Sequence, residues 1–308
     1  MNPSFDSARV AAHAVAALQD YPTGSLYLVA TPIGNLADIS LRTLHLLSLV
    51  DAVACEDTRH SQQLFRSLGL DTAKPQWIAL HQHNEASTSR DVIAALQKGL
   101  RVAYLSDAGA PGISDPGTRL VRLTLQAGLR AIPLPGASSV TTLLSASGAW
   151  LSDRADFVFQ GFLPAKGQAR ALRLSELMQD PRPQCLLEAP HRIEELASAL
   201  GQQPLRGLTV GRELTKQFEE VALLDTHQFG TWLRASPHRL KGEFALVLHE
   251  IPSTEDTAAP AGERELRVLL PHLPLKTAVQ VATELSGGSR KVLYALALAL
   301  QDTPQPET

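Results

Sequence analysis

Short apolar runs alternate with longer segments of helical period from residue 25 onward. This alternation is typical of βαβ units, in which a helix returns the chain to a neighbouring parallel strand. Strands are predicted near residues 25–30, 51–56, 76–80, 101–106 and 131–134. Helices are predicted between them, at 40–49, 59–68, 85–96 and 118–127. The first half of the chain is therefore expected to be an α/β domain around a parallel-rich sheet.

The alternation changes after the segment 133–139, which is rich in Pro, Gly and Ser. Further strands, with fewer helices between them, are predicted at 157–160, 184–188, 208–212, 219–224 and 243–249. This pattern favours a second sheet that is mixed and partly antiparallel. The fold class expected from both halves is a two-domain α/β protein.

Residues 252–262 have the composition of a linker and no apolar period. Beyond it, helical patterns at 275–285 and 290–300 flank a Ser-Gly-Gly-Ser turn, which gives the outline of a helix-turn-helix. The same outline suits a helical hairpin packed on the body or on a partner, and both alternatives stay open. The predicted organisation is a frayed helix or tail at 1–23, a first α/β domain at 24–136, a second at 137–251, the linker at 252–262 and a helical C-terminal region at 263–301.

Composition limits the classes of function. With 308 residues, of which 44% are hydrophobic, the chain can bury a large core. A formal net charge of -3 provides no bulk field that would attract nucleic acid, so any RNA site has to be local. The two cysteines, Cys55 and Cys185, are predicted to be buried free thiols, which suits a reducing cytosol. No apolar stretch reaches the roughly 18 residues of a membrane helix, and no signal peptide is recognisable. A soluble, cytoplasmic protein is expected.

Two rigid loops follow predicted strands. The loop 106–117 reads SDAGAPGISDPG, and the loop 31–36 reads TPIGNL. Glycine allows backbone amides to approach a ligand closely, and proline fixes the loop shape before binding. Open α/β sheets bind ligands at this edge, although both segments also suit ordinary βα turns. Neither loop matches GxxxxGK[ST] or GxGxxG, which argues against an ATPase or a dehydrogenase.

Charged groups gather at the same predicted edge. Residues 56–60, Glu-Asp-Thr-Arg-His, come where the second strand meets its helix. A carboxylate there can hold a hydroxyl or orient a base, but Asp57 also suits a helix cap and Arg59 a simple ion pair with Glu56. The segment 81–85, His-Gln-His-Asn-Glu, lacks a third strong ligand, and its alternate residues point to opposite faces. We therefore expect no metal, and favour substrate contact or helix capping by Asn84.

Cations follow the predicted strands of the second half. The segment 161–167, GFLPAKG, precedes Arg170 and Arg173, an arrangement that suits a grip on a phosphate backbone as well as a solvated helix face. Charged residues also follow strand ends at 188–192 and 211–216. These segments are expected to form the second lip of one cleft.

Eight short motifs in this order resemble one family. They are TPIGNL at 31–36, EDTR at 56–59, HNE at 83–85, SDAGAPGISDPG at 106–117, LPG at 134–136, GFLPAKG at 161–167, APHR at 189–192 and GRELTK at 211–216. Together they are similar to the bacterial small-subunit (16S) ribosomal RNA cytidine 2'-O-methyltransferases, within the tetrapyrrole-methylase superfamily. The resemblance extends from about residue 25 to residue 300.

The resemblance implies a fold, a cofactor and partners. It implies a homodimer of two-domain protomers with S-adenosylmethionine between the domains, and a substrate that is small-subunit ribosomal RNA or the assembled small subunit. The cofactor-binding positions that it implies are Pro32, Ala108, Gly109, Ala110, Ile113, Ser138 and Ser139. Their loop neighbours Gly34 and Pro111 are included as candidates. The chain departs from the superfamily in having Gly109-Ala110-Pro111 in place of Gly-Asp-Pro. It also has Glu188-Ala189-Pro190 where close relatives are expected to have aromatic-Glu-Ser.

Methyl transfer to a 2'-hydroxyl needs alignment of the oxygen and a group that takes its proton. The candidate bases are Asp57, Glu85 and Asp107. The candidate substrate-binding residues are Arg59, His83, Asn84, Lys166, Arg170, His191, Arg192 and Arg212. Two rival hypotheses are a superfamily methyltransferase acting on a small tetrapyrrole-like acceptor and a nonenzymatic RNA-binding assembly factor.

Overall fold

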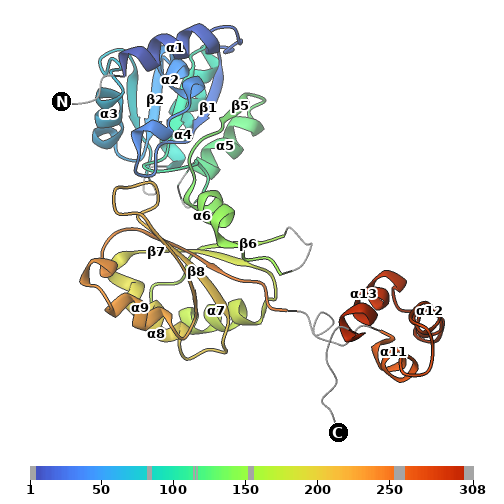
Figure 1. Ribbon diagram of the computed structural model, residues 1–308. Coiled ribbons are helices and arrows are strands. Elements are labelled where there is room, and N and C mark those ends of the chain that lie inside the picture. Colours follow the sequence, from blue (N-terminus) through green and yellow to red (C-terminus); the bar gives the residue numbers. More distant parts are fainter. Residues whose placement is uncertain are drawn as a thin grey trace. The chain divides into compact units, whose positions relative to one another are not determined.

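The computed structural model describes residues 5–81, 85–113, 115, 117–151, 156–252 and 261–301. The chain divides into two compact units, Met1–Glu250 and Ile251–Thr308, which are described separately below. The larger unit contains both sheets, and the smaller contains helices α11 to α13 (Figure 1). The finer domain boundaries that the sequence suggests stay predictions.

The first sheet has five strands in the order β3-β2-β4-β1-β5. The strands are β1 (Ser25–Val29), β2 (Ala52–Cys55), β3 (Gln76–Ala79), β4 (Val102–Leu105) and β5 (Arg130–Leu134). Every pairing is parallel, with β1 between β4 and β5. The parallel-rich first sheet predicted from the alternating pattern is confirmed. Its carboxyl edge brings together the loops that follow β1, β2 and β4.

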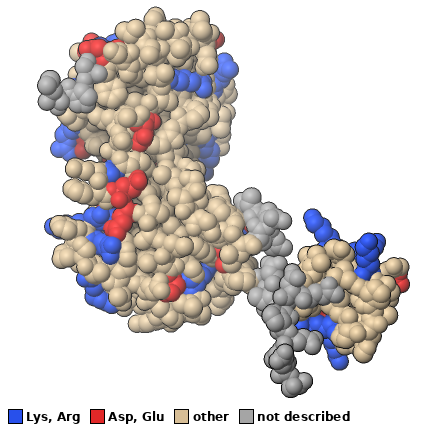
Figure 2. All heavy atoms as spheres, in the orientation of Figure 1, with Lys and Arg blue, Asp and Glu red and all other residues tan. Residues whose placement is uncertain are grey.

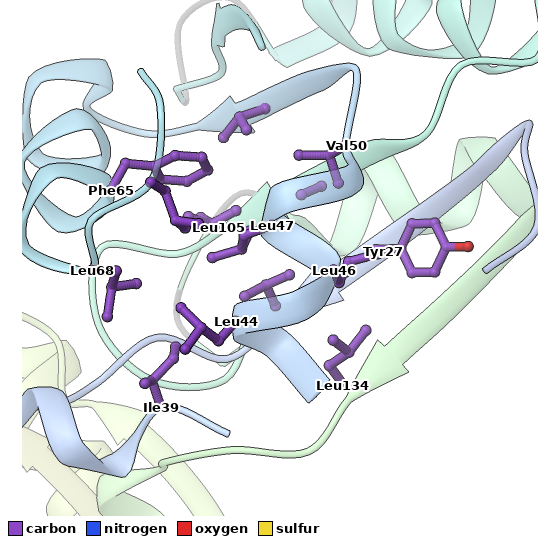
Figure 3. Packing of buried hydrophobic residues seen from close by; sticks show 14 of the residues in the cluster. Tyr27, Ile39, Leu44, Leu46, Leu47, Val50, Phe65, Leu68, Leu105 and Leu134 are labelled. Atoms are coloured by element: carbon purple, nitrogen blue, oxygen red, sulfur yellow. The ribbon is translucent and has the colours of Figure 1, made fainter. Parts of the chain in front are cut away.

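Helices cover both faces of this sheet. The helices α2 (Leu41–Leu49) and α3 (Thr58–Ser67) pack on one face, while α4 (Glu85–Gln97) and α5 (Gly117–Gln126) pack on the other. Ser40 begins α2 as its N-cap, because its side chain accepts from the backbone N–H of Thr43. Figure 3 shows Leu44 and Leu47 of α2 and Phe65 of α3 in the same apolar cluster. The result is a three-layer α/β/α arrangement.

An additional helix, α1 (Asp6–Ala16), occupies the segment predicted to be a frayed helix or tail. It lies along α2, with Ala12 and Ala16 buried (Figure 1). The ring of His45 on α2 lies 5.4 Å from that of His13 and 5.3 Å from that of Tyr21, measured between centroids. The N-terminal helix is therefore a packed part of the larger unit.

The packing around His45 predicts acid sensitivity. Burial, and then the neighbouring His13, lower the pKa of His45. The unfolded chain therefore binds this proton more readily than the folded one, so stability is complete above the usual histidine pKa of about 6.5 and falls as the pH drops below it. Urea unfolding at pH 7.5 and 5.5 should show the free energy of unfolding falling by up to about 1.4 kcal/mol per pH unit for each such proton.

The matched variant is His45→Phe, which keeps a ring beside Tyr21 but cannot titrate. It should lose less stability than the wild type between the two pH values. An equal loss in both proteins would mean that His45 does not titrate differently on unfolding. His249 gives a residual loss of the same sign, because burial, and then Arg206, lower its pKa as well.

The second sheet has the order β6-β7-β10-β8-β9. Its strands are β6 (Val158–Phe162), β7 (Gln184–Glu188), β8 (Gly207–Arg212), β9 (Glu220–Asp225) and β10 (Phe244–Leu248). The β6–β7 pair is parallel, whereas the other pairs are antiparallel, so the predicted mixed sheet is confirmed.

Helices also cover both faces of the second sheet. On one face lie α7 (Gln168–Gln179), α8 (Ile193–Leu200) and α9 (Phe229–Arg234). On the other lies α6 (Ser139–Ser147), whose apolar side chains share a cluster with Ile33 of the first loop and Leu214 of the GRELTK segment. This shared cluster connects the loops of the first sheet to the second sheet. Short 3₁₀ turns lie at Leu36–Asp38, Pro190–Arg192 and Pro237–Leu240.

In its described residues 261–301 the smaller unit has three helices, α11 (Glu263–Leu269), α12 (Leu275–Ser286) and α13 (Arg290–Gln301). They enclose a core of their own, formed by Leu266, Ala278, Val279, Ala282, Leu293 and Ala297. Gly287 ends α12 with a φ of 68°, in the left-handed region that glycine adopts readily.

Two other predictions concern the whole chain. Cys55 and Cys185 are buried free thiols, as expected. Among the described residues, no helix combines the length and apolar character required to cross a membrane.

Candidate active site

A cavity of about 290 Å³ opens within the larger unit, at the carboxyl edge of the first sheet and against β7 and β10 of the second. Its lining residues are Ile33, Glu56, Ser106, Asp107, Ala108, Ile113, Asp115, Ser139, Phe162, Leu187, Glu188, Leu214, Glu243, Phe244 and Ala245. Apolar side chains and carboxylates predominate among them. Such a lining suits an amphipathic ligand that carries positive charge.

The two rigid loops are joined at this cavity. Thr31 and Gly109 exchange backbone hydrogen bonds of 3.0 and 3.1 Å, and the Thr31 hydroxyl donates to the carbonyl of Ser106. Gly109 has a φ of 81°, and a Cβ there would lie 3.3 Å from Cγ2 of Ile33. Glycine is therefore needed both for the turn and for the close approach of the loops.

Three carboxylates from the first domain reach the cavity, namely Glu56 after β2 and Asp107 and Asp115 in the loop after β4. Asp115 accepts from the Tyr104 hydroxyl at 2.9 Å and from the backbone N–H groups of Gly112 and Gly117, both at 2.6 Å. These three hydrogen bonds fix the orientation of the Asp115 carboxylate.

Glu56 has the opposite environment. Burial, and then the charges of Asp107 and Asp115, raise its pKa above the ordinary glutamate value. A carboxylate with a raised pKa holds a proton more strongly, which is the property required of a general base.

Within the described part of the chain, no group of three or more His, Cys, Asp or Glu residues is arranged to hold a metal.

The GRELTK segment closes over the first loop. A Cβ at Gly34 would overlap Cγ of Lys216, so the lysine stem lies directly on the glycine. The Lys216 ammonium pairs with Glu213 at 2.9 Å and with Glu243 at 3.0 Å. Glu213 and Thr215 have positive φ values of 51° and 66°. This conformation is strained for Thr215, because threonine is β-branched. Within the described part of the chain, Glu213 and Thr215 are the non-glycine residues with positive φ, and they flank Leu214 at the cavity.

A buried charge network lies on the opposite wall. Glu188, whose side chain is fully buried, pairs with Arg170 at 3.0 Å and with Arg192 at 3.0 Å. Both guanidiniums also donate to backbone carbonyls of the GFLPAKG segment. This network therefore joins β7, α7 and the loop after β6.

Comparison with known proteins places the chain in a family. Residues 25–227 match the Tetrapyrrole (Corrin/Porphyrin) Methylases, and residues 256–301 match the RsmI C-terminal HTH domain. The chain is 41% identical to the ribosomal RNA small subunit methyltransferase I of Haemophilus influenzae, over 90% of this chain and 97% of that protein. It is 39% identical to the protein of the same name from Escherichia coli O157:H7, over 92% of this chain and 97% of that one. The chain belongs to the ribosomal RNA small subunit methyltransferase I family.

Solved structures agree on the fold of this family member. Diphthine synthase has a TM-score of 0.56 at 14% identity, covering 76% of this chain and 93% of its own. Cobalt precorrin-4 methyltransferase has a TM-score of 0.53 at 15% identity, covering 73% of this chain and 94% of its own. The predicted tetrapyrrole-methylase-like fold with a C-terminal helical extension is confirmed.

Several candidate residues of this family member meet at the cavity. Asp107, Ala108, Ile113 and Ser139 line it, and Ser138 stands at the start of α6 beside Ser139. The remaining candidate cofactor residues, Pro32, Gly34, Gly109, Ala110 and Pro111, lie in the two loops that supply Ile33 and Ala108 to the lining. Their contact with a cofactor stays a prediction.

Other candidates lie away from the lining. Asp57 caps α3 and pairs with Arg59 at 2.8 Å, and the Arg59 side chain is 90% exposed. Glu85 begins α4 and lies 3.9 Å from Arg119. His83 and Asn84 fall outside the described residues. The capping and ion-pair alternatives for residues 57–59 therefore have direct structural support, although the partner of Arg59 is Asp57 and not Glu56.

The candidate RNA-binding cations divide into two groups. Lys166 and His191 are exposed. Arg170 and Arg192 pair with Glu188, while Arg212 donates to the carbonyls of Lys241 and Phe218. A direct contact of Arg170 or Arg192 with a phosphate would require the network around Glu188 to open.

The candidate set omits Glu56, Asp115, Phe162, Glu188, Leu214 and Glu243, all of which line the cavity. The place of Glu56 at the sheet edge could have been predicted, because it is the first residue after the buried strand β2. Phe162 belongs to the GFLPAKG segment that the sequence places at the cleft. Glu243 carried no such signal, since its place in the lining depends on how the second sheet packs.

Proposed function

We propose that this protein transfers a methyl group from S-adenosylmethionine to the 2'-hydroxyl of a cytidine in small-subunit ribosomal RNA. The observation that carries the proposal is the identity of about 40% over about 90% of the chain to several proteins named ribosomal RNA small subunit methyltransferase I. The choice of the 2'-hydroxyl and of cytidine rests on the eight motifs from TPIGNL to GRELTK.

The residues of the cavity fit S-adenosylmethionine. Carboxylates on the first domain attract the positive charge of the cofactor, and the apolar side chains of Ile33, Leu214 and Ala245 suit its adenosyl group. The backbone of Gly109 approaches Ile33 closely, which leaves the loop after β4 free of side-chain bulk at this point. We assign cofactor binding to the loops 31–36 and 106–113 and to the start of α6. When bound, S-adenosylmethionine supplies an electrophilic methyl group on a sulfonium sulfur.

The chain itself has to orient the acceptor and take its proton. Glu56 directly follows β2, and Asp107 comes two residues after the end of β4; both line the cavity, and we assign them to the acceptor hydroxyl. Glu56 suits the role of proton acceptor because of its raised pKa, whereas Asp107 suits that of hydrogen-bond acceptor. Asp57 and Glu85 would act only if their present partners, Arg59 and Arg119, moved away.

Charge offers limited help in binding RNA. On the face of the larger unit in Figure 2, several Lys and Arg gather at the lower left beside Asp and Glu, and the others are scattered among uncharged residues. The helical unit is more basic, because its described residues 261–301 include Arg264, Arg267, Lys276, Arg290 and Lys291 but only Glu263, Glu265 and Glu284 as acids. We assign it to RNA contact and favour the assembled subunit as substrate, since shape would then supply affinity that bulk charge does not. A cytoplasmic homodimer is part of the same proposal.

The test is transfer of labelled methyl groups to small ribosomal subunits and, separately, to protein-free RNA, both from cells that lack the enzyme. We expect label in subunits, and nucleoside analysis should identify 2'-O-methylcytidine. Label on the base or on another nucleoside would contradict the proposed acceptor.

Two outcomes would favour the rival hypotheses. Methyl transfer to a tetrapyrrole without transfer to RNA would support a small-molecule acceptor. Tight binding to subunits with no turnover and no S-adenosylmethionine binding would support a nonenzymatic assembly factor.

A further inference from the structure

Phe162 separates two cavities. It ends β6 and lines both the cavity described above and a second one of about 270 Å³. The second cavity is lined by Gln160, Phe162, Leu163, Pro164, Ala169, Leu172, Arg173 and Glu176. Phe162 is 50% exposed, so an aromatic surface is available for contact beside the proposed site of methyl transfer.

The backbone that follows Phe162 is fixed. The carbonyl of Leu163 accepts from Arg192 at 2.7 Å, and that of Pro164 accepts from Arg170 at 3.1 Å and from Arg192 at 3.2 Å. Both guanidiniums are held in turn by the buried carboxylate of Glu188. A half-exposed ring is therefore attached to a preorganised loop, which lowers the entropy lost when a ligand binds.

The second cavity combines an aromatic surface with hydrogen-bonding groups. Arg173 pairs with Glu176 at 2.8 Å and donates to the side-chain carbonyl of Gln160. Leu172, which is 61% exposed, adds an apolar contact. The volume is below the roughly 300–1,000 Å³ of typical ligand pockets, so it suits a single ring system. An aromatic ring beside amide, guanidinium and carboxylate groups is the chemistry by which proteins bind an unstacked nucleobase.

We propose that the second cavity binds the base of the acceptor nucleotide, stacked on Phe162, while its ribose lies at the first cavity. The inference rests on the proposed function, because it divides one nucleotide between two cavities that share a wall. Lys166, exposed in the loop after Phe162, is placed to contact an adjoining phosphate. Phe162 is thus a residue that positions the acceptor nucleotide.

The test uses Phe162→Leu, which removes the aromatic surface, and Phe162→Tyr, which keeps it. Phe162→Leu should raise the KM for small ribosomal subunits about 10-fold or more, since stacking on an aromatic side chain contributes strongly to binding each base. Phe162→Tyr should remain close to the wild type. Phe157→Leu is the matched control, because Phe157 is 40% exposed and lines neither cavity. Phe157→Leu should bind S-adenosylmethionine with the wild-type affinity in a calorimetric titration. Because Phe162 also lines the first cavity, the same titration is needed for Phe162→Leu, and a rise in KM matched by an equal loss of cofactor affinity would contradict the base site.

A second readout does not depend on turnover. In Phe162→Trp, a short single-stranded RNA containing cytidine should quench the added indole fluorescence, measured against the wild type with its three tryptophans. An unchanged KM in Phe162→Leu together with no quenching would overturn the inference. Quenching by RNA in a protein that methylates neither subunits nor RNA would support this base site and contradict the proposed function instead.

Discussion

Replacement of Glu188 by alanine is expected to lower the free energy of unfolding by about 3–5 kcal/mol. The carboxylate is fully buried and pairs with Arg170 and Arg192, whose side chains are only 5% and 17% exposed. Its removal leaves Arg192 without the pairing to Glu188, and leaves Arg170 with only the exposed Glu195 at 3.7 Å, both in a poorly solvated place. Urea unfolding of the larger unit, followed by circular dichroism, measures the loss. A loss below about 1 kcal/mol would contradict this account, because it would equal that of an exposed pair.

The matched control is Glu176→Ala. Glu176 pairs with Arg173 at 2.8 Å, but the two side chains are 51% and 45% exposed. Water solvates both charges after the substitution, so the loss should be about 0.2–1 kcal/mol. Glu188→Gln keeps an oxygen acceptor for one guanidinium. Its loss of unfolding free energy should lie between those of Glu188→Ala and Glu176→Ala. This intermediate variant also gives a result if Glu188→Ala does not fold.

Replacement of Glu56 by glutamine is expected to lower kcat for methyl transfer by about 10²- to 10⁴-fold, the usual contribution of a general base. Glutamine keeps the size of the side chain but cannot accept the hydroxyl proton. The wild-type rate should rise with pH through the raised pKa of Glu56, because only the ionised carboxylate acts as a base. In Glu56→Gln this dependence should be absent. Single-turnover rates on small ribosomal subunits between pH 5 and 8 provide the comparison.

Asp57→Asn is the control for this experiment. Asp57 is adjacent in sequence but caps α3 and pairs with the exposed Arg59, so its loss should leave kcat near the wild-type value. Asp107→Asn distinguishes the two residues that face the cavity. We expect Asp107→Asn to retain the pH dependence of the wild type. A wild-type kcat in Glu56→Gln, or loss of the pH dependence only in Asp107→Asn, would assign the proton to Asp107.

The sequence predicted the fold well where strands and helices have distinct periods. The parallel sheet follows from buried runs such as 102–105 separated by amphipathic segments. The prediction of the helix Asp6–Ala16 was weaker, because Val10 and Val15 lie on its exposed face and reduce the contrast between its apolar and polar faces. Packing on α2 stabilises it, and a sequence read segment by segment does not contain that contact.

The candidate site was predictable to the extent that it depends on strand ends. Asp107 and Ala108 come shortly after a buried strand, with Ser106 between, so their place at the sheet edge could be inferred. Glu243 reaches the cavity only because β10 lies between β7 and β8, and this order is set by long-range antiparallel pairing. Arg170 and Arg192 were predicted to bind RNA, because nothing in the local sequence shows that Glu188 pairs with both of them.

The contact of Lys216 with Gly34 also constrains how this sequence can change over time. Any larger residue at Gly34 would overlap the lysine stem, whereas a shorter residue at 216 would free that space but leave Glu213 and Glu243 without their shared cation. Replacement of the glycine is therefore expected to follow that of the lysine, and the lysine is easier to lose where the half-buried Glu213 is lost with it. Positions 34, 213 and 216 are thereby coupled although they are far apart in the sequence, whereas Glu243, whose side chain is 72% exposed, can vary independently.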